Sequence, residues 1–586
     1  MSGIVESGTP QKGMGEIIPE VAKLGAGADR ASVILSRTTT RYYPNGAQTI
    51  KSNANRTLQF RIAASSMLDP MTSYITFRAL AHDPRTRLED YAHSFIQKAV
   101  LKCGGVEIEN IDRVDLAHRM LAYATSPKQY YEHTAAACQG AWKYAPKAGA
   151  ALYGTAVADS PVVAGKRTGG VALNQASIGS ALHPDSYPYF AEENPLWNQG
   201  DARDTIGTLG TSTIGQGTHF QIPLSEIFGF FKTSKYIPLF CLGALDIELT
   251  MNDYANCCFE GHVYKFDNGN PNNFPHNALD VRPVDGTALN GNAVEAAKRV
   301  YELRDIRIHT DLCDADPVFT MLITQMASQS ATGLQIPFTS CVLQQKVISN
   351  AGRNTISINK GVSFLRSVVV AMRPLPLTNT PMRQKSNFMY GDTFSQYQMT
   401  IGNKNFPQNP ITDTTESYVE LLKSMGLHNN ISSGSVLTKD VYTGRVDSLR
   451  SFGGGVLDDT ERMTVLGGTV GQPIAGTLVD VDQQAKQQFL LGLNTEKVLQ
   501  AGILSGTNLR LSGFNIVLDL QLQTRTEALA ELTSNTGLAM NVDDHKADAA
   551  RLKPSLVWYD YDVEVNTLML IDKSVSIRAD QVSVAE

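Results

Sequence analysis

The sequence has little charge and lacks any long apolar run. Of its 586 residues, 18% are charged, below the roughly 25% typical of soluble proteins. The formal net charge is −6, and no basic stretch is present that would bind nucleic acid through its phosphates, so sequence-specific nucleic-acid binding is not expected. No run of about 18 apolar residues could span a bilayer, and no apolar segment of a signal peptide follows Met1. We therefore expect synthesis in a reducing cytosol.

The cysteines form no pattern of a zinc or redox centre. There are seven of them, and no two are spaced as the CxxC pair that such centres use. Adjacent Cys257 and Cys258 could form a redox pair, but two partly buried thiols are the expected state. The sequence therefore indicates reduced cysteines without a catalytic role.

The usual constellations of catalytic or metal-binding residues are also missing. The eleven histidines include no HxH pair, and an isolated histidine is more often a surface or satisfied interior residue than a ligand. Asp543, Asp544 and His545 are interpreted as a solvated loop. The cluster of Asp311, Asp314 and Asp316 lacks the glycine and alternation of a calcium loop, and Asp316 is explained as a helix cap; calcium bridging between subunits stays open.

Glycine-rich patches and aromatic residues do not indicate an enzyme either. Neither 453–455 nor 467–468 is followed by the Lys-Ser/Thr of a phosphate-binding loop, and no GxSxG motif occurs. The tryptophans, Trp142, Trp197 and Trp558, are scattered, and no pair of carboxylates stands out. We predict no catalytic, cofactor-binding or metal-ligating residue, no cofactor, and a structural role instead of an enzymatic one.

What the sequence does contain is an internal repeat of β-strand pattern. The stretch 219–251 includes Leu245, Ile247 and Leu249 alternating with polar residues, and 488–522 includes a similar series from Phe514. Period-two alternation predicts strands with one buried face. Phe220 to Leu249 and Phe489 to Leu518 span the same 29 positions. We interpret the two stretches as the closing strands of one β-module that the chain uses twice.

Further strands are predicted throughout, and helices are few. Strand patterns cover 31–43, 56–64, 72–80, 96–108, 301–311, 333–338, 355–372 and 394–403, with a final pair of strands in 555–579. Helices are expected from an Asp112 cap to about Ala124, over 316–329, and over 416–425. The fold class is mainly β, because the strands do not alternate with helices as in α/β folds.

The same pattern divides the chain into two modules. Residues 1–30 are expected to form a flexible arm, and 31–314 the first module, with a long Ala- and Gly-rich loop insertion at about 140–217. A linker helix at 315–332 separates it from the second module, 333–586.

Four segments, taken in order, resemble the double jelly-roll major capsid proteins of icosahedral DNA viruses. They are Leu101–Leu121 (LKCGGVEIENIDRVDLAHRML), Phe220–Met251 with its FQIPL run, Tyr301–Met326 followed by GLQIPF, and SGTNLRLSGFNIVLDL with the terminal VWYDYDVEVNTLMLIDKSVSIRA. This lineage includes adenoviruses, virophages, polinton-like viruses, large eukaryotic DNA viruses and membrane-containing phages. The resemblance spans roughly 30–580, and departs from the family in the long insertion and over about 425–484.

The resemblance implies two consecutive eight-stranded antiparallel jelly-roll sandwiches with short helices and long loops. It also implies a homotrimeric, pseudo-hexameric capsomer that tiles an icosahedral virion shell. The partners would be other copies of the chain, neighbouring capsomers, and penton and minor capsid proteins, with an internal membrane left open. The alternatives are another β-rich virion component, such as a penton, spike or tail protein, and a carbohydrate-binding or hydrolytic β-sandwich protein.

Overall fold

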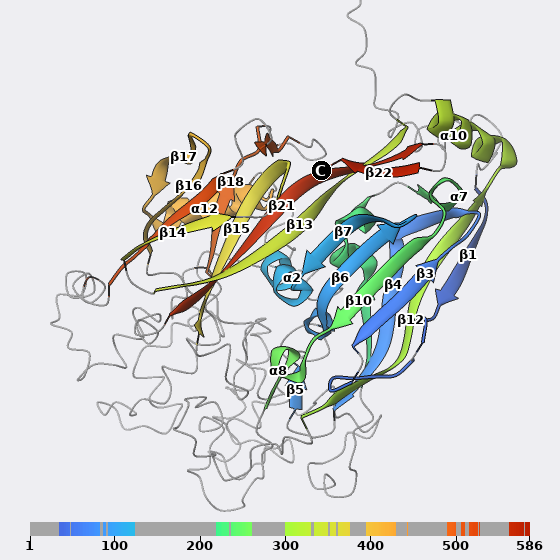
Figure 1. The fold of residues 1–586 in the computed structure, drawn as a ribbon, viewed down its shortest axis with the longest axis horizontal. Coiled ribbons are helices and arrows are strands. Elements are labelled where there is room, and N and C mark those ends of the chain that lie inside the picture. The colour runs from blue at the N-terminus through green and yellow to red at the C-terminus, as the bar shows by residue number, and fades with distance from the viewer. Residues whose placement is uncertain are drawn as a thin grey trace, which may run out of the picture.

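The computed structural model describes most of the predicted strands (Figure 1). Apart from short gaps, it describes residues 34–122, 218–260, 299–375, 394–428, 489–527 and 562–585, together with Tyr442. The predicted N-terminal arm and the long insertion lie outside the described residues, as do all three tryptophans, the glycine patches and Asp543 to His545.

The first half of the chain builds two facing antiparallel sheets. One sheet has the order β1 (Ile34–Tyr42), β12 (Tyr301–Ala315), β4 (Met67–Ala81) and β8 (Thr218–Pro223), with β2 (Ile50–Lys51) on β12 and β9 (Ile237–Pro238) on β4. The other has the order β3 (Thr57–Ile62), β10 (Leu245–Met251), β6 (Ile96–Cys103) and β7 (Val106–Asp112). A separate ribbon pairs β5 (Thr86–Leu88) with β11 (Cys258–Glu260).

The second half repeats the strand order of the two main sheets. One sheet has the order β13 (Leu334–Ile348), β21 (Val563–Arg578), β15 (Phe364–Pro374) and β18 (Leu490–Asn494), with β19 (Thr507–Asn508) on β15 and β22 (Gln581–Ala585) on β21. The other has the order β14 (Gly352–Ile358), β20 (Ile516–Leu522), β16 (Phe394–Ile401) and β17 (Lys404–Ile411). In both halves the last long strand lies between the first and the third, which is the connectivity of a jelly roll.

The prediction of two consecutive eight-stranded jelly-roll sandwiches is therefore confirmed. Even the small additions correspond, because β9 and β19 both pair with the third strand of their sandwich. Short helices join the strands: η1 (Ala92–Phe95), α2 (Val114–Ala122), α6 (Leu224–Ile227), η5 (Gly229–Lys232), α7 (Leu239–Leu242), α8 (Tyr254–Cys257), α10 (Pro317–Gln329) and α12 (Thr414–Ser424). In both sandwiches a helix, α2 or α12, follows the edge strand.

The predicted repeat corresponds to β10 and β20, but these strands do not close the sandwiches. Both show alternating burial over seven residues. Leu249 lies opposite Leu58 and Ala99, and Leu518 opposite Ile356 and Met399, so each strand is central in its sheet. The closing strands are β12 and β21.

Several predicted boundaries are wrong for local reasons. The range 96–108 contains two strands, because Gly104 and Gly105 turn the chain with positive φ angles. The range 355–372 likewise contains the end of β14 and most of β15. The predicted final pair in 555–579 is instead one sixteen-residue strand, β21, followed by β22.

Of the two predicted helix caps, the one at Asp112 is wrong and the one at Asp316 is confirmed. Asp112 ends β7, and the carbonyl of Arg113 accepts the first helical hydrogen bonds, from the N–H groups of Leu116 and Ala117 at 3.1 and 3.0 Å. Asp316 does cap α10, because its Oδ1 accepts the N–H of Val318 at 2.7 Å.

Two hydrophobic cores fill the sandwiches, and each takes residues from the other half. The first core includes Leu334, Ile336 and Phe338 of β13. The second core includes Leu116 and Met120 of α2. Figure 1 shows β13 and β21 running from the second sandwich across to the first. Within the described ranges, no helix is both long and apolar enough to cross a bilayer.

Candidate functional site

The two sandwiches meet at a fully buried carboxylate, Glu109 of β7. Its two oxygens accept the N–H groups of Gly229 and Phe230, the first residues of η5, at 3.1 and 2.8 Å. Burial raises the pKa of Glu109, while hydrogen bonds from Ser340 and from η5, and the charge of Lys573, act in the opposite direction. Ser340 and Lys573 belong to β13 and β21, so this carboxylate lies among groups of both sandwiches.

Gly229 permits the close approach of η5 to the second sandwich. A Cβ atom built on it would lie 1.9 Å from the carbonyl oxygen of Thr339 in β13, a distance that no side chain tolerates. The next residue, Phe230, packs its ring edge-on against Phe338 of β13, with 5.5 Å between the ring centroids. The junction is thus a tightly packed contact that requires glycine at one point.

A second buried charged contact is an ion pair on β21. Arg373 of β15 bonds Glu564 of β21 at 2.5 Å, and both side chains are largely buried. Burial alone would raise the pKa of Glu564, but Arg373, Asn566 and Arg113 together hold it below its ordinary value. Arg113, which follows β7 and has a φ of 56°, brings a charge of the first sandwich near this pair.

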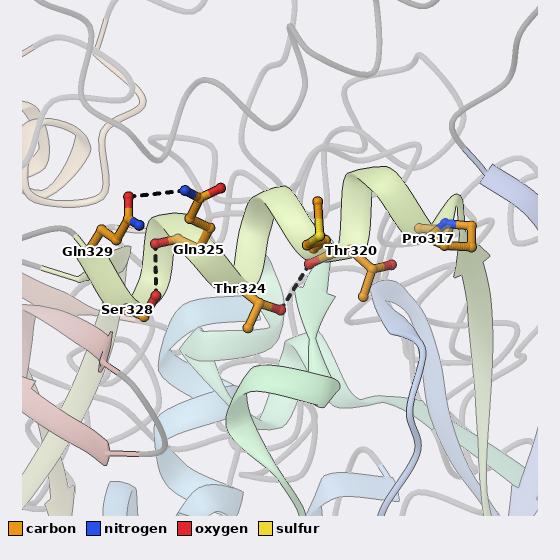
Figure 2. A pocket seen from close by; sticks show the side chains of 8 residues that line it. Pro317, Thr320, Thr324, Gln325, Ser328 and Gln329 are labelled. Atoms are coloured by element: carbon orange, nitrogen blue, oxygen red, sulfur yellow. Dashed lines mark hydrogen bonds between the residues drawn. The ribbon is translucent and has the colours of Figure 1, made fainter.

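The outer face of α10 is exposed and uncharged, with apolar residues mainly in its first half and polar residues in its second half. Phe319, Ile323 and Ala327 face the core, whereas Val318 and Met321 are 71% and 66% exposed. Figure 2 shows the shallow hollow along this helix, lined by Pro317, Met321, Thr324, Gln325, Ser328 and neighbours. Its hydroxyl groups bond carbonyls of the helix itself, as Thr324 does to Thr320 at 2.9 Å. Such a surface suits contact with another protein surface more than chemistry.

Strand β1 is an edge strand that is largely exposed. Its Arg37 bonds Asp69 and Asp311, at 2.8 and 2.7 Å. Burial alone would raise the pKa of Asp311, but hydrogen bonds from Thr39 and Arg37 hold it below its ordinary value. Asp314 accepts the hydroxyl of Ser36 at 2.7 Å. The three aspartates of the predicted cluster therefore have separate roles: Asp311 and Asp314 bond side chains of β1, and Asp316 caps α10.

Cys257 and Cys258 are more buried than predicted. Both have no exposed surface, and their sulfur atoms lie 3.6 Å apart, as separate thiols. Burial also raises the pKa of Cys103 to about 11, a value at which the thiol stays protonated.

Sequence reasoning missed one cluster of ionisable side chains. His93 of η1, His118 of α2 and Glu226 of α6 bring one potential ligand atom each within 4.8 Å of the other two. The imidazole rings stack with 3.3 Å between centroids and 6° between planes. The Nε2 of His93 lies 3.2 Å from a carboxylate oxygen of Glu226. Burial lowers the pKa of His118 well below its ordinary value, and His93, Lys232 and Arg119 lower it further.

Neither a protein-family model nor a curated protein matches the sequence. Among solved structures, the chain is similar to the Faustovirus major capsid protein, with 8% identity, a TM-score of 0.47, and coverage of 96% of this chain and 97% of that one. It is similar to the mavirus major capsid protein at 10% identity and TM-score 0.42, over 95% and 92% of the two chains. A chain of the PBCV-1 virus capsid matches at 10% identity and TM-score 0.45, over 94% and 96%.

All three are viral capsid proteins. The double jelly roll of this chain rests on its own strand order and pairing.

Proposed function

We propose that this protein is the major capsid protein of an icosahedral DNA virus, and that three copies form a pseudo-hexameric capsomer. The observation that carries the proposal is the duplicated sandwich: the same strand order occurs in both halves of one chain. Three such chains present six similar sandwiches, which is the number that a hexagonal tile of a shell requires.

The junction between the sandwiches supports this role. A capsomer needs its two sandwiches at a fixed relative position, because six of them must close a ring. Shared core residues, such as Phe338 and Met120, and the buried contact of Glu109 with η5 hold them in this way. Flexibly tethered binding modules would have little reason for a buried contact of this kind.

The exposed surfaces support assembly more than catalysis. The uncharged outer face of α10 and the edge strand β1 lie on the first sandwich, and both offer groups that another chain could cover. We propose α10 as part of the contact between copies of the chain. The domain division at 1–30, 31–314, 315–332 and 333–586 also remains a proposal, since the start of β13 packs in the first core.

The oligomeric state tests the proposal directly. A trimer of 63.7 kDa chains has a mass of about 190 kDa, which light scattering of the purified protein would measure. Electron microscopy of concentrated protein should then show hexagonal particles or sheets. A stable monomer at every concentration would overturn the capsomer.

Residence in the virion and contacts with penton and minor capsid proteins follow from the same proposal, which leaves an internal membrane open. Cross-linking of purified particles followed by mass spectrometry would identify such neighbours. A penton, spike or tail component is the remaining candidate, and a five-fold or elongated assembly in the same micrographs would favour it.

A further inference from the structure

We propose that His93, His118 and Glu226 bind one zinc-like divalent transition-metal ion, which joins α2 to α6 inside the first sandwich. The three side chains come from η1, α2 and α6, and their potential ligand atoms lie within 4.8 Å of one another. Two imidazoles and one carboxylate form a ligand set that zinc accepts in proteins.

One ligand distance already suits a zinc site, while the two imidazole rings would have to reorient. In tetrahedral zinc sites with bonds of about 2.0–2.1 Å, ligand atoms lie about 3.3–3.4 Å apart. The Nε2 of His93 and the carboxylate of Glu226 are already 3.2 Å apart. The parallel rings of His93 and His118 have to tilt so that both nitrogen lone pairs point to one ion. Their side-chain torsions would have to change for this, because stacked parallel rings direct their lone pairs along parallel planes.

The surroundings select the kind of ion. His93 has no exposed surface and His118 only 7%, so an ion bound between them would be shielded from water. The charges of Lys232 and Arg119 act on His118 and oppose any cation there. Mg²⁺ and Ca²⁺ prefer oxygen ligands, and one carboxylate is too few to bind them. Zinc also binds the nitrogen atoms of both imidazoles.

The positions of the ligands along the chain suggest what the ion would do. His118 lies in the middle of α2 (Val114–Ala122), and Glu226 lies in α6, directly after β8. The two ligands therefore lie far apart in sequence. A metal bridge between them would close a long loop of the chain and would stabilise the folded state, in which the ligands meet.

Metal content and spectroscopy test the site on the whole protein. Protein purified without chelator or affinity histidines should contain about one zinc per chain. Removal of the metal should lower the midpoint of thermal unfolding, and added Zn²⁺, but not Mg²⁺, should restore it. Co²⁺ added to the metal-free protein should give the visible absorption of a tetrahedral site without a thiolate charge-transfer band.

Two glutamate variants provide the comparison. Glu226→Gln keeps the size of this partly exposed side chain but removes its charge. It should weaken Co²⁺ binding about tenfold or more, because mutation of groups that only hydrogen-bond metal ligands already lowers metal affinity 10- to 100-fold. Glu248→Gln removes a carboxylate of β10 that bonds Lys102 at 3.4 Å, and should leave binding unchanged. Equal binding by both variants, a thiolate band, or folded protein that neither contains nor binds Zn²⁺ would each overturn the proposal. None of these results depends on whether the protein forms capsomers.

Discussion

Phe230 donates its backbone N–H to the carboxylate of Glu109 at 2.8 Å, inside the junction between the two sandwiches. This bond and its neighbour from Gly229 make Glu109 the acceptor for two backbone groups that have no contact with water. An amide side chain has one oxygen only, so it would leave one of these N–H groups facing another donor. Loss of such a buried hydrogen bond costs about 1–3 kcal/mol.

We therefore expect Glu109→Gln to lower the stability of the protein, with a definite dependence on pH. The native pKa of Glu109 is raised, so its carboxyl contributes stability below its ordinary pKa and loses it as the pH rises through the native value. The gap in unfolding midpoint between wild type and variant should be largest in acid and narrow toward higher pH. Thermal unfolding over a pH series measures this gap, and a constant gap would contradict the prediction.

Glu564 should show the opposite dependence. Its native pKa is lowered, so its stabilising effect is present above its ordinary pKa and disappears as the pH falls through the native value. Glu564→Gln leaves the buried Arg373 without its charge partner, which costs about 3–5 kcal/mol in comparable pairs. The same unfolding series should therefore show a gap that closes in acid. A gap that widens in acid would refute the assignment.

Gly229→Ala should separate the sandwiches or prevent correct folding. The added methyl group would lie 1.9 Å from the carbonyl oxygen of Thr339, and relief requires movement of two backbones. We expect a loss of stability above about 3 kcal/mol, in the range of severe core overpacking. Gly361→Ala is the matched control, because a Cβ there meets nothing within 4 Å. Equal unfolding midpoints for the two variants would show that the junction is not tightly packed.

Met321→Asp should change assembly without changing the fold. Met321 is 66% exposed on α10, so its replacement should alter stability by no more than about 0.5 kcal/mol. A charge on this uncharged face should nevertheless weaken the proposed contact between chains. Light scattering should report a shift from trimer toward monomer. The control is Val419→Asp, at an exposed residue of α12 in the second sandwich, which should leave the protein trimeric. A full trimer for Met321→Asp would exclude α10 from the contact.

Strands that bury one face were predictable from the alternation of apolar and polar residues. Strands buried on both faces were not. In β10 the series LDIELTM alternates in burial residue by residue, so the pattern identifies it. In β18, LLGLN, four of five residues are buried, including Gly492, whose Cβ would lie 2.4 Å from Leu421 of α12. A short apolar run without alternation cannot be identified as a strand from its periodicity. The need for glycine at 492 follows from the close packing against α12, which the sequence does not show.

The interior polar sites were not predictable, because their members are far apart in sequence. Glu109 looks like any exposed position of an alternating strand, and nothing near it indicates that Phe230 lies opposite. His93, His118 and Glu226 likewise have no common motif, and each read alone is an ordinary residue. Asp316 was predictable because a helix cap is local, with its partner Val318 two residues away.

The central position of β21 has a consequence for how the chain is made. In the second sandwich this strand pairs with β13 on one side and β15 on the other, yet it follows them by about 190 residues or more and ends only at Arg578. During translation the first sandwich receives its own central strand, β12, once residue 315 has emerged from the ribosome. The second sandwich lacks its central strand until residue 578 has emerged, and the first core also receives its last residues, Val575 and Ile577, only then. Until that point the nascent chain exposes the edges of β13 and β15 that β21 will cover, and chaperones would have to protect them.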